Sequence, residues 1–306
     1  MVYLSIVIPI YNEELIVKEL VNRLNNELIK INSNYEIIFV DDGSTDQSWK
    51  RVLESNIENA KVKGLKLSRN FGHHYAITAG LNKSKGDWVV VMDGDLQDRP
   101  EVISKLHLKA LEGFDVVFVS RANRPEGFFY KILQRIFYIL LNFLSGQKFD
   151  STQANFSIIN RQVVEAFKDF PEQARFYSST IKWLGFTRAS IEADHGRRLE
   201  GKPSYTFKKR VKLATDIIIA YSDRPLKFAI GLGLILSAFS LILSAWVIIG
   251  YFNWGFTVIG WPSLIASILF IGGINMIILG IMGAYISRIF QEVKRRPLYI
   301  IKDELK

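Results

Sequence analysis

The longest uncharged stretch of the chain is the feature that most limits how it can fold. No Asp, Glu, Lys or Arg occurs from Phe228 to Ser287. Residues 226–251 and 262–285 each exceed the roughly 20 apolar residues that a helix needs to cross a bilayer. We therefore expect two membrane-spanning helices in this region. The alternative is a buried apolar hairpin of a soluble protein.

The residues that flank these two segments predict their orientation. Trp254 and Trp261 lie in the uncharged connection between the segments, as aromatic residues at a membrane interface do. Basic residues gather at the opposite ends of both segments, away from the connection between them. They are Arg224, Lys227, Arg288, Lys294, Arg295 and Arg296. By the positive-inside rule, we expect both termini and the region before the first segment to lie on the cytoplasmic side of the cell membrane.

The first 120 residues have the residue pattern of a soluble α/β domain. Apolar runs typical of buried strands alternate with amphipathic segments typical of helices. The expected strands are 4–10, 36–40, 62–67, 89–92 and 114–119, and the expected helices are 15–31, 48–56 and 73–82. This alternation predicts a doubly wound, mostly parallel sheet with helices on both faces.

One of these strands ends in a pair of acidic residues. Val89-Val90-Val91-Met92 runs directly into Asp93-Gly94-Asp95. Carboxylates at positions i and i+2 of an extended segment point the same way. Such hard oxygen donors suit Mg²⁺ or Mn²⁺, which usually share phosphate oxygens with a substrate. A turn in which Asp and Gly serve only the backbone geometry is the alternative.

Composition excludes several other site types. The chain has no Cys, which excludes disulfides and Cys-ligated zinc. The Gly-rich dinucleotide fingerprint is missing, because Pro9-Ile10-Tyr11-Asn12-Glu13-Glu14 stands between the first strand and helix, and no phosphate-binding P-loop motif occurs. The net charge of +9 suits nucleic acid, anionic lipid or a polyanionic substrate.

Two further segments combine apolar and basic residues. Residues 128–144 are very apolar but carry Lys131 and Arg135, and residues 206–221 begin basic and end apolar. Both patterns are typical of helices that lie on a membrane surface, and a core helix is the alternative for residues 128–144. A basic run can also bind nucleic acid, but the apolar segments that follow favour the membrane. We therefore expect no nucleic-acid partner.

Three stretches together resemble a known enzyme family. They are Val7-Ile8-Pro9-Ile10-Tyr11-Asn12-Glu13-Glu14, Asp41-Asp42-Gly43-Ser44-Thr45-Asp46 and Asp93-Gly94-Asp95-Leu96-Gln97-Asp98-Arg99-Pro100. In this order and spacing they resemble family 2 glycosyltransferases of the GT-A fold. Leu96-Gln97-Asp98 and the paired C-terminal apolar segments narrow the resemblance to polyprenyl-phosphate glycosyltransferases, the group of dolichol-phosphate mannose synthase and GtrB-type enzymes. The resemblance implies a GT-A sheet followed by interfacial helices and two transmembrane helices.

The resemblance also implies roles for individual residues. The nucleotide-binding residues would be Pro9, Tyr11, Glu13, Asp42 and Asp93, with Asp42 accepting hydrogen bonds from the base. The metal ligands for Mg²⁺ or Mn²⁺ would be Asp93, Asp95 and Gln97. Catalytic roles would fall to Asp150, a candidate base, and to Arg121, Arg135 and Arg198. The acceptor phosphate would be bound by Arg124, Arg198, Lys202 and Arg210.

The resemblance assigns no catalytic role to the two adjacent histidines. His73 and His74 open an expected helix inside a segment similar to the family's R-N-x-G-x-x-x-A-x-x-A-G pattern. We expect them to serve in packing and in shaping the loop.

Taken together, these features predict a membrane-bound inverting glycosyltransferase. It would move a sugar from a UDP- or GDP-linked donor to polyprenyl phosphate, with undecaprenyl phosphate as the expected acceptor and membrane lipids as surroundings. Homo-oligomers are expected because tetramers occur among related enzymes. The alternatives are a membrane-tethered glycosyltransferase that extends another glycan or lipid, and a non-catalytic protein that binds nucleotide-sugars. The predicted parts are a cytoplasmic catalytic domain (1–205), a juxtamembrane helix (206–225), a two-span region (226–287) and a basic cytoplasmic tail (288–306).

Overall fold

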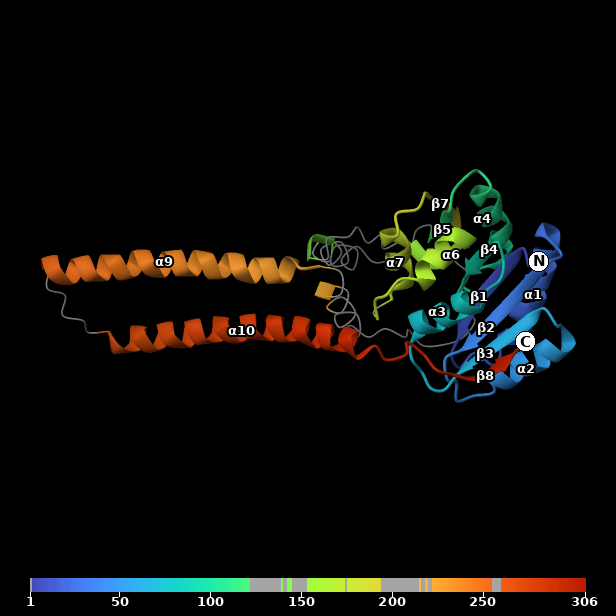
Figure 1. Ribbon diagram of the computed structural model, residues 1–306, viewed down its shortest axis with the longest axis horizontal. Coiled ribbons are helices and arrows are strands. Elements are labelled where there is room, and N and C mark those ends of the chain that lie inside the picture. The colour runs from blue at the N-terminus through green and yellow to red at the C-terminus, as the bar shows by residue number, and fades with distance from the viewer. Residues whose placement is uncertain are drawn as a thin grey trace, which may run out of the picture. The chain divides into compact units, whose positions relative to one another are not determined.

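The computed structural model of the protein describes residues 2–121, 139, 142–144, 153–173, 175–193, 215, 218–219, 222–254 and 260–306. The chain divides into two compact units (Figure 1). The first unit comprises residues 1–126, 150–204 and 296–306, and it contains the sheet. The second comprises residues 127–149 and 205–295, and it contains the two long helices.

The first unit is built on one mixed sheet, which in the described residues has eight strands in the order β7-β5-β6-β4-β1-β2-β3-β8. The central strands β4, β1, β2 and β3 are parallel, as the alternation of strands and helices predicts. β6 runs antiparallel to both β4 and β5, and β7 runs parallel to β5. The strands are β1 (Leu4–Ile10), β2 (Tyr35–Asp41), β3 (Val62–Leu67), β4 (Trp88–Val91), β5 (Val116–Arg121), β6 (Gln153–Asn160), β7 (Arg188–Ala193) and β8 (Ile301–Leu305).

Helices cover both faces of this sheet and give three layers. α1, α2 and α4 pack on one face against Ile6 and Ile8 of β1, whereas α3, α6 and α7 lie on the other face, where Val7 of the same strand points. This alternation follows from the period of two along a strand. The helices of this unit are α1 (Val17–Ile31), α2 (Ser48–Glu58), α3 (His73–Lys83), the 3₁₀ turn η1 (Pro100–Val102), α4 (Ile103–Ala110), α6 (Arg161–Lys168) and α7 (Tyr177–Trp183).

The last residues of the chain add a strand that the sequence analysis did not predict. β8 pairs antiparallel with β3 at the edge of the sheet. Lys83 of α3 forms an ion pair with Glu304 at 2.7 Å, and Asn82 donates a hydrogen bond to the Tyr299 hydroxyl at 2.7 Å. The expected tail at 288–306 is therefore helical up to Lys294 and ends as part of the sheet.

The second unit contains the two long apolar helices that the sequence predicts. α9 (Arg224–Trp254) has 31 residues and α10 (Trp261–Lys294) has 34. Both are long and apolar enough to cross a membrane, and most of their large apolar side chains are exposed. The Tyr285 hydroxyl donates to the Ser222 carbonyl at 2.7 Å, so the end of α10 lies beside the start of α9. The basic ends of both helices are therefore at the same end of the pair.

The two segments predicted to lie on the membrane surface fall almost wholly outside the described residues. In the segment 128–144, residue 139 and residues 142–144 are helical, and in the segment 206–225 the same holds for residues 215, 218 and 219 before α9 begins. These residues agree with the helices expected there. The position of either segment at a membrane surface stays a prediction.

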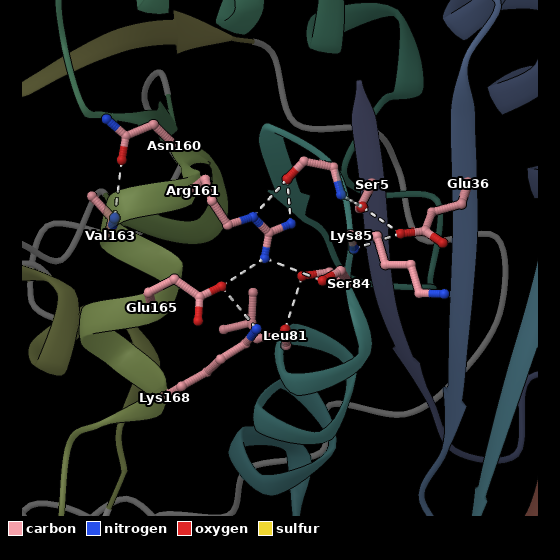
Figure 2. A network of polar contacts seen from close by, with 11 residues as sticks. Ser5, Glu36, Leu81, Ser84, Lys85, Asn160, Arg161, Val163, Glu165 and Lys168 are labelled. Carbon is pink, nitrogen blue, oxygen red and sulfur yellow. Dashed lines mark hydrogen bonds and ion pairs between the residues drawn. The ribbon is translucent and has the colours of Figure 1, made fainter. Parts of the chain in front are cut away.

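A buried polar network braces the sheet at the amino ends of β1, β2 and β4 (Figure 2). Glu36 is 1% exposed, and its Oε1 accepts hydrogen bonds from the Ser5 hydroxyl and the Lys85 backbone N–H, both at 2.7 Å. Its Oε2 forms an ion pair with Lys63 at 2.7 Å. The Arg161 guanidinium at the start of α6 donates to the carbonyls of Ser84 and Gly86 in the same loop. The network fixes the amino ends of these strands, whereas the acidic loops follow their carboxyl ends.

The charge of Glu36 makes this network dependent on pH. Burial opposes ionisation of the Glu36 carboxyl, but the hydrogen bonds from Lys63, Ser5 and Lys85 outweigh it and lower its pKa. A lowered pKa means that the folded state prefers the carboxylate more than the unfolded state does. This stabilisation is complete above the unfolded pKa of about 4.3 and is lost as the pH falls through the lower folded value.

Replacing Glu36 by Gln should lower the free energy of unfolding by about 2 kcal/mol at pH 7, because a buried charge-assisted contact to Lys63 is lost. Thermal unfolding of the full chain in detergent should show a midpoint lowered by about 5 °C. The difference from the wild type should shrink below about pH 4. The control is Glu58→Gln, which removes an exposed pair with Lys18 and should change little. A Glu36→Gln effect no larger than the control effect would contradict this account.

Candidate active site

The acidic loops meet at one edge of the sheet because of the strand order. β1 lies between β2 and β4 and is parallel to both. The carboxyl ends of these strands therefore lie side by side, which is the edge where open α/β sheets bind ligands. Residues 11–14 follow β1, residues 41–46 end β2 and begin the next loop, and residues 93–98 follow β4.

The loops after β1 and β2 hold each other through side-chain and backbone hydrogen bonds. The Asn12 backbone N–H donates to the Ser44 hydroxyl at 3.0 Å, and the Asn12 side-chain oxygen accepts from the Thr45 N–H at 2.9 Å. The Glu13 N–H donates to the Ser48 hydroxyl at 2.7 Å. Asn12 has a left-handed backbone with φ of 56°, which a short polar residue tolerates well. The two loops thus form one connected platform.

Asp42 anchors a third segment to this platform. Its two carboxylate oxygens accept backbone N–H groups from Phe71 at 2.8 Å and from Gly72 at 2.9 Å. Asp42 is only 3% exposed, and burial raises its pKa although these two N–H groups oppose the change. Each carboxylate oxygen has a second lone-pair site. The predicted contact of Asp42 with a base is thus compatible with the site, and the structure adds a second role, support of the loop before α3.

The loop after β4 is shaped by its own acidic side chains. Asp98, 4% exposed, accepts the backbone N–H of Asp93 at 3.0 Å, and Asp95 accepts the N–H of Gln97 at 3.1 Å. Leu96 is buried with a left-handed φ of 59°, a costly conformation for a bulky residue. Strain of this kind gathers at functional sites. Because Asp98 accepts the backbone N–H of Asp93, it is a structural residue of the loop, a role that the sequence analysis missed.

Gly94 lets Glu13 approach the loop after β4. A Cβ atom added at Gly94 would clash with Glu13 Oε2 and would come within 2.9 Å of the Ile10 side chain. Only glycine therefore fits between Asp93 and Asp95 in this packing. The carboxylate of Glu13, from the loop after β1, consequently lies directly against the candidate metal loop.

The two adjacent histidines have different surroundings. His73 Nε2 lies 3.2 Å from Asp93 Oδ1 and 3.2 Å from Asn155 Nδ2. Burial opposes the charged imidazolium of His73, but Asp93 outweighs this and raises its pKa. His74 packs against Phe176, and burial lowers its pKa to about 3, so it is neutral near pH 7. The packing role expected for both holds for His74, whereas His73 lies in the acidic site.

The side chains at this edge fit a magnesium- or manganese-type site. No group of three or more His, Asp or Glu side chains in the described residues is arranged to hold a metal by itself. Mg²⁺ is commonly held by one or two carboxylates together with substrate phosphates and water. Asp93 and Asp95, two residues apart on one loop, match that donor set, and Gln97 follows two residues later on the same loop. Such a site would be completed by the phosphates of its substrate.

The structure brings together most of the residues that the sequence singles out. Pro9 is buried in β1, and Tyr11 is 45% exposed at the start of the next loop. Arg121 ends β5 at this same edge, because β5 is parallel to β4, with β6 between them. At about 4.8 Å per strand, this places the Arg121 backbone roughly 10 Å from β4. The remaining predicted residues, Arg124, Arg135, Asp150, Arg198, Lys202 and Arg210, lie outside the described residues.

A comparison of folds finds solved structures with the same architecture. Glucosyl-3-phosphoglycerate synthase from Mycobacterium tuberculosis, in complex with Mn²⁺, UDP-glucose and phosphoglyceric acid, superposes with a TM-score of 0.53. The match covers 71% of this chain and 77% of that chain at 18% sequence identity. At this identity the similarity shows the fold alone, and that fold is GT-A.

Sequence comparison identifies the family. The model of "Glycosyl transferase family 2" matches residues 5–168. "Uncharacterized glycosyltransferase YkcC" of Bacillus subtilis is 38% identical over 97% of this chain and 93% of its own. "Prophage bactoprenol glucosyl transferase homolog" of Escherichia coli is 35% identical over 98% of each chain, and "Bactoprenol glucosyl transferase" of Shigella phage SfV is 34% identical over 98% of each. The chain described here therefore belongs to glycosyltransferase family 2.

Proposed function

We propose that the protein transfers a sugar from a nucleotide-sugar to polyprenyl phosphate, with inversion at the anomeric carbon. The observation that carries the proposal is the presence, in one chain, of the acidic site at the sheet edge and of two long helices with exposed apolar surfaces. A soluble donor and a lipid acceptor require both parts. Relatives that match nearly the whole chain and are named bactoprenol glucosyl transferases support this acceptor class.

In this proposal the loops at the edge of the sheet bind the donor. Asp42 would accept a hydrogen bond from the base, while Pro9, Tyr11 and Glu13 line the nucleotide pocket. Asp93, Asp95 and Gln97 would hold Mg²⁺ or Mn²⁺ against the diphosphate. A divalent ion in this place supplies Lewis-acid stabilisation of the charge that develops on the leaving nucleotide. The Mycobacterium tuberculosis enzyme of the same fold binds Mn²⁺ and UDP-glucose, which supports a divalent ion here.

The acceptor needs positioning more than it needs a base. A phosphate monoester has a second pKa near 6 and is mostly ionised at neutral pH. The main obstacle is therefore the repulsion between two anionic substrates, which cationic side chains and proximity overcome. We assign this work to basic residues and give Asp150 at most a minor part as a base. The residues in question are Arg121, Arg124, Arg135, Arg198, Lys202 and Arg210.

The membrane part would place the active site next to the lipid phosphate. We propose that α9 and α10 cross the cell membrane and that both of their basic ends face the cytoplasm, where nucleotide-sugars are found. The segments 128–144 and 206–221 would lie at the interface and flank the entrance for the acceptor. Each basic residue near an anionic surface contributes about 1 kcal/mol to such binding. A homo-oligomer would be compatible with this arrangement.

The purified full chain should convert undecaprenyl phosphate and a labelled nucleotide-sugar into a labelled lipid that partitions into chloroform. A panel of UDP- and GDP-sugars tests donor choice, and EDTA should abolish the product while Mg²⁺ or Mn²⁺ restores it.

Asp95→Asn should lower the rate at least about 100-fold, because a group that stabilises developing charge is lost. Asp303→Asn, an exposed site on β8, is the matched control and should retain activity.

The other outcomes of this assay each reject the proposal in a recognisable way. Label found only in a glycan or a different lipid identifies an enzyme that extends another acceptor. Donor binding without any transfer identifies a nucleotide-sugar-binding protein that has no catalytic activity. Full activity in EDTA would show that transfer needs no divalent ion, which contradicts the proposed metal site.

Topology can be tested independently of activity. A reporter fused after Lys306 should be cytoplasmic, and a reporter inserted at Asn253, near the end of α9, should lie on the opposite side of the membrane. The physical reason is the cluster of basic residues at the shared end of α9 and α10. If both reporters mark the same compartment, the two-span arrangement is wrong.

A further inference from the structure

The first residue of α3 lies between the two parts of the donor site. His73 follows Gly72, whose backbone N–H is held by Asp42, and the His73 imidazole reaches Asp93 at 3.2 Å. A single three-residue segment, Phe71-Gly72-His73, thus connects two carboxylates. They are Asp42, which we propose binds the nucleobase, and Asp93, which we propose binds the metal ion. Nothing in the family resemblance assigns His73 a role in the reaction.

The backbone geometry of this segment leaves little freedom to the imidazole. Gly72 has φ of 115° and ψ of 149°, a conformation open almost only to glycine. Asp42 accepts the N–H groups of both Phe71 and Gly72, and the Gly72 carbonyl accepts the N–H groups of Tyr75 and Ala76 in the first turn of α3. His73 is therefore held at a fixed place above the end of β4.

The chemistry of the contact defines what the imidazole does. A ring nitrogen carries either one hydrogen or one lone pair, so His73 Nε2 either donates to Asp93 or accepts from Asn155. Beside an ionised Asp93, whose Oδ1 lies 3.2 Å from Nε2, the favoured arrangement is a hydrogen on Nε2 that faces the carboxylate. A contact of this kind restrains the rotation of a carboxylate that we propose as a metal ligand, and such outer partners commonly change metal affinity 10- to 100-fold.

We propose that His73 is a positioning residue, which orients Asp93 for the divalent ion and is itself placed by Asp42 through Gly72. The inference rests on the metal site of the proposed function. It assigns the imidazole no contact with the transferred sugar and no proton-transfer step. It predicts that loss of His73 weakens binding of the ion and leaves the fold intact.

Binding of Mn²⁺ tests this without the lipid acceptor. Free Mn²⁺ can be measured by electron paramagnetic resonance with the full chain in detergent, in parallel samples containing UDP or GDP. His73→Ala should raise the dissociation constant for Mn²⁺ about 10-fold. His73→Gln, whose side-chain amide can present an N–H near the place of Nε2, should restore most of the affinity.

The matched control is His107, a buried histidine near the amino ends of the strands. His107 Nε2 lies 2.7 Å from the Tyr3 hydroxyl, and His107 is 7% exposed. His107→Gln should leave Mn²⁺ binding unchanged, and thermal unfolding of each variant monitors folding. Wild-type Mn²⁺ affinity in His73→Ala would overturn the proposal, as would equal weakening in His107→Gln. Failure of the wild-type chain to bind Mn²⁺ would instead reject the metal site itself, and the role of His73 with it.

Discussion

The structure depends on a concentration of carboxylates at the carboxyl ends of β1, β2 and β4. Asp42, Asp93 and Asp95 lie there, and the packing of Gly94 brings Glu13 among them. Like charges at short range repel, and burial makes the repulsion harder to screen. Backbone N–H groups offset part of this cost at Asp42, and the His73 imidazole offsets part of it at Asp93. A divalent ion bound with a diphosphate, the ligand that we propose for this site, would neutralise much of the rest.

The opposite edge of the sheet shows how the fold tolerates this cluster. There a buried carboxylate, Glu36, is fully engaged by Lys63, Ser5 and the Lys85 N–H, and Arg161 ties the neighbouring loop to α6. The two ends of the strands therefore contrast: at the amino ends the buried carboxylate is paired by Lys63, Ser5 and Lys85, whereas at the carboxyl ends several acidic groups gather. The costly left-handed backbone of Leu96 also lies at the carboxyl ends of the strands.

Much of this arrangement follows from local patterns in the sequence. Long apolar runs predict β1, β2 and β4 because strands buried on both faces need no polar alternation, and the uncharged region from Phe228 to Ser287 predicts α9 and α10. β8 escaped prediction because it is a short edge strand with only Ile301 and Leu305 as apolar anchors, and it pairs with β3 more than 200 positions away. The contacts of His73 with Asp93 and Asn155 escaped for the same physical reason: they join residues distant in sequence, and no local period encodes them.

The central claim is that the acidic edge of the sheet binds a nucleoside diphosphate together with a divalent ion. The most direct measurement is a structure of the full chain with Mn²⁺ and UDP or GDP, with data collected at the manganese absorption edge. The account predicts an anomalous peak within coordination distance of Asp93 and Asp95, with the diphosphate on the same ion and the base next to Asp42. A manganese peak elsewhere, or a nucleotide bound away from the ends of β1, β2 and β4, would contradict it.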